Sequence, residues 1–183
     1  MKNRLFMLCA ALLTCLMISC LTSSGDGDEN TGTSLINYKI TESDLSGWTL
    51  TNTDVYPTVQ ELADAINGDV IRFDSYTGMT ESMTQRLEKS SDQTINAIMV
   101  YYTVEKSAAD MLKDRETSNT GSTLALPGYD NNTAFYVTGI GTITVYAKLK
   151  QCYIELLIGG IDDETTAKQV AVQVLGVYES KIQ

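Results

Sequence analysis

The chain has 183 residues, 43% of them hydrophobic, with 13 lysine and arginine residues against 23 aspartate and glutamate residues, a formal net charge of −10 at pH 7. This length suits one domain with its own core, and the excess of acid argues against nucleic acid or anionic lipid as a partner, because both attract positive charge. The sequence contains no histidine, which excludes Ser-His hydrolases, Cys-His proteases and ordinary histidine-ligated zinc sites.

The first 19 residues have the three-part layout of a secretory signal peptide. Lys2 and Arg4 precede an apolar block from Leu5 to Ile18, and small or polar residues follow it. The block is shorter than the roughly 20 apolar residues that a membrane-spanning helix requires. The pattern therefore predicts an export signal.

The end of this segment resembles the signal peptides of bacterial lipoproteins. Met17, Ile18 and Ser19 directly precede Cys20, with Met17 at a place where the usual pattern prefers leucine. The resemblance implies cleavage after residue 19, acylation of Cys20 by palmitate-type chains and attachment to a membrane, to which each buried methylene contributes about 0.8 kcal/mol. Leu21 stands where an aspartate would signal retention at the inner membrane, so the resemblance implies the outer membrane, on its periplasmic or its surface side. The alternative is an ordinary cleaved signal with an incidental cysteine.

Residues 20–36 are expected to form a flexible, acidic tether. They are rich in Ser, Gly, Thr, Asp and Asn and have no apolar periodicity, so they bury too little surface to become ordered. Asp26, Asp28 and Asn30 alternate as in a calcium-binding EF-hand loop, but Thr31 stands where that loop needs glycine. We therefore expect no metal here, and nothing in the sequence indicates a cofactor.

Residues 37–183 are expected to fold as a single α+β domain with three helices. Thr58 can cap the first helix and Gly68 can end it in the left-handed conformation. Ser107 is the expected cap of the second, and Asp163 lies at the start of the third, where a carboxylate is favoured by the helix dipole. The apolar spacing places these helices at residues 57–68, 107–116 and 163–180.

Two groups of three strand-like runs separate the helices. They are residues 71–74, 83–87, 94–105, 134–138, 142–150 and 151–159. Residues 95–104 are apolar on both faces and are expected at the centre of the sheet. Because short connections imply antiparallel pairing, we expect one mainly antiparallel six-stranded sheet with packed helices, in the order α-βββ-α-βββ-α. This pattern resembles the small antiparallel α/β/α sandwiches of periplasmic accessory proteins, at the level of the fold alone.

The cysteines give no sign of a disulfide or of catalysis. Cys9 and Cys15 would leave with the signal and Cys20 would carry lipid, so Cys152 has no partner. Cys152 shares the inward phase of its strand with Ile154, where a cysteine behaves as a small hydrophobe. We therefore predict no catalytic residue and no enzymatic activity.

The most promising contact surface combines tyrosines with a long polar loop. The chain has 10 tyrosines, and tyrosine suits wet recognition surfaces, although it also packs well under a helix. Four tyrosines lie on strands in phases that need not face the core: Tyr101, Tyr136, Tyr146 and Tyr153. The loop at 118–132 carries three large side chains, and long loops are often functional. The candidate binding residues are Leu124, Leu126, Tyr129, Tyr136 and Tyr146.

The leading hypothesis is a lipid-anchored protein of the cell envelope that binds a partner protein or an envelope component without catalysis. An alternative is a module that binds a small molecule or a glycan through the tyrosines and the 118–132 loop. A third is a hydrolase that uses carboxylates alone, which the missing histidine disfavours. A deep aromatic cleft would favour the second, two convergent carboxylates in such a cleft the third, and a filled sheet the first.

Overall fold

The computed structural model describes residues 34–68, 73 and 75–183. The expected signal, the acylation site at Cys20 and most of the expected tether lie outside the described residues. Ser34–Gln183 form one compact unit, and Leu35 is fully buried in it, so the fold includes the last residues of the segment expected to be a tether. Within the described part of the chain, no helix is both long enough and apolar enough to cross a membrane.

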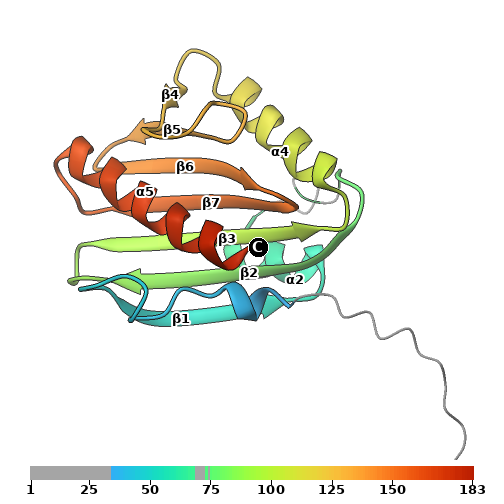
Figure 1. Cartoon of the computed structure of the whole chain (residues 1–183), viewed down its shortest axis with the longest axis horizontal. Helices are drawn as coiled ribbons and strands as arrows, with labels where there is room; N and C mark the ends of the chain where they lie inside the picture. Colours follow the sequence, from blue (N-terminus) through green and yellow to red (C-terminus); the bar gives the residue numbers. More distant parts are fainter. Residues whose placement is uncertain (1–33, 69–72, 74) are drawn as a thin grey trace, which may run out of the picture. The chain divides into compact units, whose positions relative to one another are not determined.

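The centre of the unit is a seven-stranded sheet in the order β1-β2-β3-β7-β6-β5-β4, in which every neighbouring pair is antiparallel (Figure 1). This confirms the α+β class and the antiparallel sheet. In chain order a short 3-10 helix, η1 (Leu35–Tyr38), comes first. The helices α2 (Val59–Ile66), α4 (Glu105–Ser118) and α5 (Glu164–Lys181) follow β1, β3 and β7. The strands are β1 Thr49–Tyr56, β2 Met79–Glu88, β3 Thr94–Tyr102, β4 Leu124–Ala125, β5 Ala134–Gly139, β6 Thr142–Leu149 and β7 Cys152–Gly159.

The strand count and order differ from the expected six. Strands β1 and β4 were not predicted, and the strand expected at 71–74 is wrong at Phe73, which is helical and fully buried; the rest of that run lies outside the described residues. Strand β1 has no clear alternation of buried and exposed residues, because its register with β2 shifts between Leu50 and Asn52. A bulge of this kind moves later side chains to the other face, which hides the period of two.

Helix α2 spans Val59–Ile66 and begins as expected. The Thr58 hydroxyl accepts a hydrogen bond from the backbone N–H of Glu61 at 3.2 Å. The helix ends at Asn67, which has φ 51 and ψ 41, so Asn67 and not Gly68 is the left-handed residue. Asparagine tolerates this conformation better than most residues with a side chain.

The other two helices are also present, with one difference in capping. Helix α4 spans Glu105–Ser118, and Ser107 lies in its first turn and donates a hydrogen bond to the Thr77 carbonyl at 2.7 Å, so it is not the cap. Helix α5 spans Glu164–Lys181, and Asp163 caps it as expected by accepting hydrogen bonds from two backbone N–H groups. Hydrogen bonds, first from the Thr166 hydroxyl and then from the backbone N–H groups, hold the pKa of Asp163 below its usual value.

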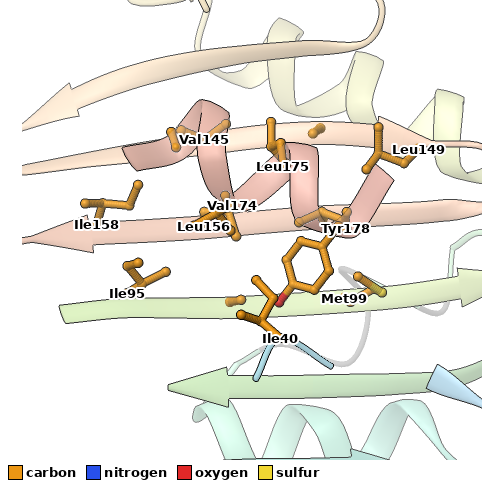
Figure 2. Close-up of a cluster of buried hydrophobic side chains, with 14 of the residues drawn as sticks. Ile40, Ile95, Met99, Val145, Leu149, Leu156, Ile158, Val174, Leu175 and Tyr178 are labelled. Carbon is orange, nitrogen blue, oxygen red and sulfur yellow. The ribbon is translucent and has the colours of Figure 1, made fainter. Parts of the chain in front are cut away.

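Helix α5 and the N-terminal segment, residues 34–48, cover one face of the sheet, and α2 and α4 lie against the other. Figure 1 shows α5 crossing in front of the sheet and α2 behind it. Alternate side chains of β3 enter two separate clusters, with Met99 in the cluster under α5 and Val100 in the cluster under α2 and α4. In Figure 2, Val174, Leu175 and Tyr178 of α5 lie against the sheet. The face under α5 is therefore filled.

A buried glutamine joins the N-terminal segment to the sheet and to α5. The Gln85 side chain on β2 is 3% exposed. Its oxygen accepts hydrogen bonds from the Ile40 N–H and the Tyr178 hydroxyl, both at 2.9 Å, and its nitrogen donates to the Ile40 carbonyl at 3.2 Å and the Thr53 hydroxyl at 3.1 Å. Figure 2 shows the Tyr178 hydroxyl beside Ile40. All four hydrogen bonds that the Gln85 amide can make are formed.

Candidate functional site

Four of the five predicted binding residues lie on the α5 face of the sheet, near its β4 edge. Leu126 is 1% exposed and Tyr136 is 4% exposed, both inside the core under α5, and Tyr129 packs against the same core. Leu124 pairs with Tyr136 across the strands and is 41% exposed. Tyr146 is on the opposite face, packed against the cluster under α2 and α4. The five side chains therefore do not form one surface.

The predicted tyrosines have structural partners. The Tyr136 hydroxyl donates a hydrogen bond to Glu164 in the first turn of α5 at 2.8 Å, and the Lys168 ammonium lies 5.6 Å from the centre of the Tyr136 ring. Burial and the Glu164 carboxylate both raise the pKa of Tyr136. The rings of Tyr146 and Phe135 lie 5.3 Å apart. These contacts hold α5 and β6 in place, which is the packing role that tyrosine also suits.

Helices α2 and α4 leave part of the second face of the sheet open, and a groove of about 470 Å³ lies there. Four adjacent strands and the C-terminal end of α2 form it. Its volume is within the range of about 300–1,000 Å³ that is usual for ligand sites. The polar and aliphatic residues that line it include Asn52 and Asp54 of β1, Arg86 of β2, Asn96 and Ile98 of β3, Leu157 of β7 and Ile66 of α2.

The strand register arranges these side chains in two rows across the sheet. Asn52 pairs with Arg86, Arg86 with Asn96, and Asn96 with Leu157, which makes one row over β1, β2, β3 and β7. The next row on the same face runs from Asp54 through Ile98 to Glu155. Residues that oppose each other on neighbouring strands lie about 5 Å apart, so a ligand lying across the strands would meet each row one residue at a time.

Hydrogen bonds between neighbours orient the polar side chains of the groove. The Asn52 amide nitrogen donates to Asp54 at 2.6 Å. Arg86 donates from Nε to Glu88 at 2.7 Å and from a terminal nitrogen to the Asn96 oxygen at 3.2 Å. The positive charge of Arg86 is thus balanced by a carboxylate of its own strand. The row is polar but carries no excess of positive charge.

The two carboxylates that line the groove are far from each other. Asp54 is on β1 and Glu155 on β7, with β2 and β3 between them. Three steps across the sheet separate their backbones by roughly 15 Å, whereas paired carboxylates in glycosidases lie about 5–9.5 Å apart. The Tyr153 hydroxyl donates to Glu155 at 3.1 Å. The arrangement disfavours a hydrolase based on this pair.

Other hollows lie beside the C-terminal part of α5. One of about 450 Å³ borders Lys148 and Ile182, and one of about 500 Å³ borders Asp44 and Gly176. Neither is built on the face of several neighbouring strands, so neither presents a regular row of side chains. Among residues 34–68, 73 and 75–183, no group of three or more cysteine, aspartate or glutamate residues could share a metal ion.

Cys152 is in the position predicted for it. Its side chain is 0% exposed, in the core under α5 with Ile154. Burial raises the pKa of the thiol to about 12, so the thiolate that acts as a nucleophile is not populated at neutral pH. This confirms the interpretation of Cys152 as a core residue.

No protein-family model matches the sequence, and no curated protein matches it. The candidate site therefore depends on the geometry of the groove.

The groove itself was missed at the level of the sequence. Asn52 and Asp54 belong to β1, which could not be recognised as a strand because its bulge breaks the alternation. Asn96 is one polar residue in a run that is otherwise apolar on both faces. The signal that could have been used is the phase of Arg86 and Asn96. Each points to the face opposite its buried sequence neighbours, which are Gln85 and Leu87 for Arg86 and Ile95 and Ala97 for Asn96, so this end of the two strands has an uncovered face.

Proposed function

We propose that this chain is a lipid-anchored protein of the bacterial cell envelope, and that its folded unit binds a partner protein or an envelope component without catalysing a reaction. The signal-like residues 1–19 and the cysteine at position 20 support the anchor. The polar composition of residues 22–33 supports a tether between the anchor and the fold. Both expectations concern residues outside those that the structure describes.

The groove is the observation that supports a binding role. A sheet with one filled face needs only solvated polar residues on its uncovered part, yet here Leu157 is 41% exposed beside the polar row. Exposed aliphatic groups next to oriented hydrogen-bonding groups are what a recognition site requires. The wide separation of Asp54 and Glu155 supports binding over hydrolysis.

A second candidate is the binding of a small molecule or a glycan at the same groove. The concave form and the volume of about 470 Å³ favour it. The tyrosines predicted as binding residues and the 118–132 loop do not support it, since Tyr136 and Leu126 are buried in the core; the tyrosine that lines the groove is Tyr56.

Two matched substitutions test the binding surface. Leu157→Asp places a charge in the groove, and Leu124→Asp places the same charge at the β4 edge; both leucines are 41% exposed. The acylated protein and both variants are cross-linked in intact envelopes and recovered, and the attached components are compared by mass spectrometry. We expect at least one component to be cross-linked to the wild-type protein and to Leu124→Asp but not to Leu157→Asp. Equal recovery with both variants, or loss with Leu124→Asp alone, would contradict the assignment of the groove.

The anchor has a separate test. The mature polypeptide should begin at Cys20 and carry the mass of fatty acyl chains, and Cys20→Ser should move the protein from the membrane fraction to the soluble fraction. An unmodified thiol at Cys20, or cleavage at another bond, would overturn the lipid-anchored part of the proposal while leaving the binding surface untouched.

A further inference from the structure

Three neighbouring strands present planar polar side chains to the groove at one level. Asn52, Arg86 and Asn96 follow each other on β1, β2 and β3, about 5 Å apart. Since the Asn52 nitrogen is bonded to Asp54 and the Asn96 oxygen to Arg86, the Asn52 oxygen remains as an acceptor and the Asn96 nitrogen as a donor. Among the described residues neither atom has another hydrogen-bond partner. The row therefore offers both an acceptor and a donor to a ligand.

The same row ends on an aliphatic surface. Leu157 pairs with Asn96 and is 41% exposed, and Ile98 lies half-buried in the next row. A ligand that matches the row and this aliphatic surface needs hydrogen-bonding groups at its edges and a C–H surface on one side. Sugar rings have this combination, because their hydroxyls are both donors and acceptors and their ring faces are apolar.

The charge of the groove restricts the ligand further. Arg86 is the cation on the row, and Glu88 accepts its Nε–H at 2.7 Å. The chain as a whole carries 23 acidic against 13 basic residues. Ligands rich in phosphate, sulfate or carboxylate groups bind best to sites with an excess of positive charge, and this groove has no such excess. An uncharged ligand meets no such penalty.

We propose that the groove binds a neutral oligosaccharide that lies across the strands from Asn52 to Leu157. Its hydroxyls hydrogen-bond to the Asn52 oxygen, the Arg86 guanidinium and the Asn96 nitrogen, and the C–H face of a ring packs on Leu157 and Ile98. This names the ligand class for the proposed binding function and rests on it. An envelope glycan would supply such a chain close to an anchored protein.

The test uses the mature, acylated chain in detergent micelles and a panel of neutral hexasaccharides: maltohexaose, cellohexaose, laminarihexaose and chitohexaose. Affinity is measured by isothermal titration calorimetry, and the bound surface is located by amide chemical shifts. We expect at least one sugar to bind and to shift amides of β1, β2, β3 and β7. Because the ligand is uncharged, raising the salt concentration should leave the affinity unchanged.

Matched alanine variants connect the binding to the row. Asn52→Ala and Asn96→Ala should each weaken the affinity about two- to tenfold, the equivalent of one neutral hydrogen bond. Leu157→Ala should weaken it as well, because it shortens the aliphatic floor. Asn131→Ala is the control, since Asn131 lies in an exposed loop away from the groove. Thermal unfolding of each variant shows that the fold is kept.

The outcomes separate the ligand class from the binding function. If no hexasaccharide binds at millimolar concentration, or if Asn52→Ala and Asn96→Ala bind as tightly as the wild type, the oligosaccharide proposal is refuted. A lysine-rich peptide that shifts the same amides and dissociates in high salt would also refute it, and would point to a protein partner. In each of these three cases, a component whose cross-linking in the envelope depends on Leu157 would still support the binding function.

Discussion

Replacing Gln85 by leucine should destabilise the fold by several kcal/mol. Leucine has nearly the volume of glutamine but cannot hydrogen-bond, so the four hydrogen bonds of the Gln85 amide are lost while the packing is largely kept. At about 1 kcal/mol for each neutral hydrogen bond, the loss is about 4 kcal/mol. The buried Ile40 N–H and carbonyl and the Tyr178 hydroxyl lose a partner. Against a typical stability of about 5–15 kcal/mol this is a severe loss.

The assay is urea unfolding at neutral pH, followed by circular dichroism, with Tyr178→Phe as the comparison. Tyr178→Phe removes one of the two hydrogen bonds to the Gln85 oxygen and keeps the ring, so it should cost about 1 kcal/mol. Burial raises the pKa of the Tyr178 phenol, so the hydroxyl is protonated and can donate its hydrogen bond at the neutral pH of the assay. If Gln85→Leu cost no more than Tyr178→Phe, the idea that Gln85 holds the N-terminal segment to α5 would be refuted.

Three further predictions concern charge, reactivity and backbone conformation. Hydrogen bonds, chiefly from the Thr41 hydroxyl, lower the pKa of Asp44 from 3.8 to about 2. The stability advantage of the wild type over Asp44→Asn, measured by urea unfolding, should therefore be present above the unfolded pKa and be lost as the pH falls through about 2. An advantage independent of pH would contradict this. The Cys152 thiol, with its pKa raised to about 12 by burial, should react with a disulfide reagent at pH 8 only after urea unfolds the chain, and rapid labelling of the native protein would refute its burial. Gly160→Ala should cost well over 2 kcal/mol, because a Cβ would lie 1.8 Å from a backbone oxygen at φ +73, whereas Gly121→Ala, at φ +83 with nothing within 4 Å, should cost about 1–2 kcal/mol; equal melting temperatures for the two variants would contradict it.

The elements that could be predicted from the sequence are those with an uninterrupted period. Strand β6 alternates along its whole length and β7 alternates from Ile154 to Ile158, and α2 has both its apolar stripe and the Thr58 cap. Strand β1 could not be recognised, because its bulge breaks the alternation and because an edge strand buries few of its residues. Phe73 was misassigned because one apolar pair at a spacing of two occurs in helices as well as in strands.

The candidate site was harder to predict than the fold, for a physical reason. Its row joins Asn52, Arg86, Asn96 and Leu157, which are up to 105 residues apart in the sequence and meet only through the order of the strands. The loop residues Leu124 and Leu126 were chosen because they are close in sequence, but one of them is needed for the core. Local patterns indicate which face a side chain takes, and strand order decides which side chains become neighbours.

The separation of the two clusters on either side of the sheet has an evolutionary consequence. Residues under α5 are constrained by close packing, where the loss of a single methyl group lowers stability. The groove side chains alternate with them along the same strands but touch water, where most substitutions change stability by less than about 0.5 kcal/mol. Relatives of this protein could therefore exchange the groove residues and acquire new specificities while keeping an unchanged scaffold, much as loops diversify on other folds.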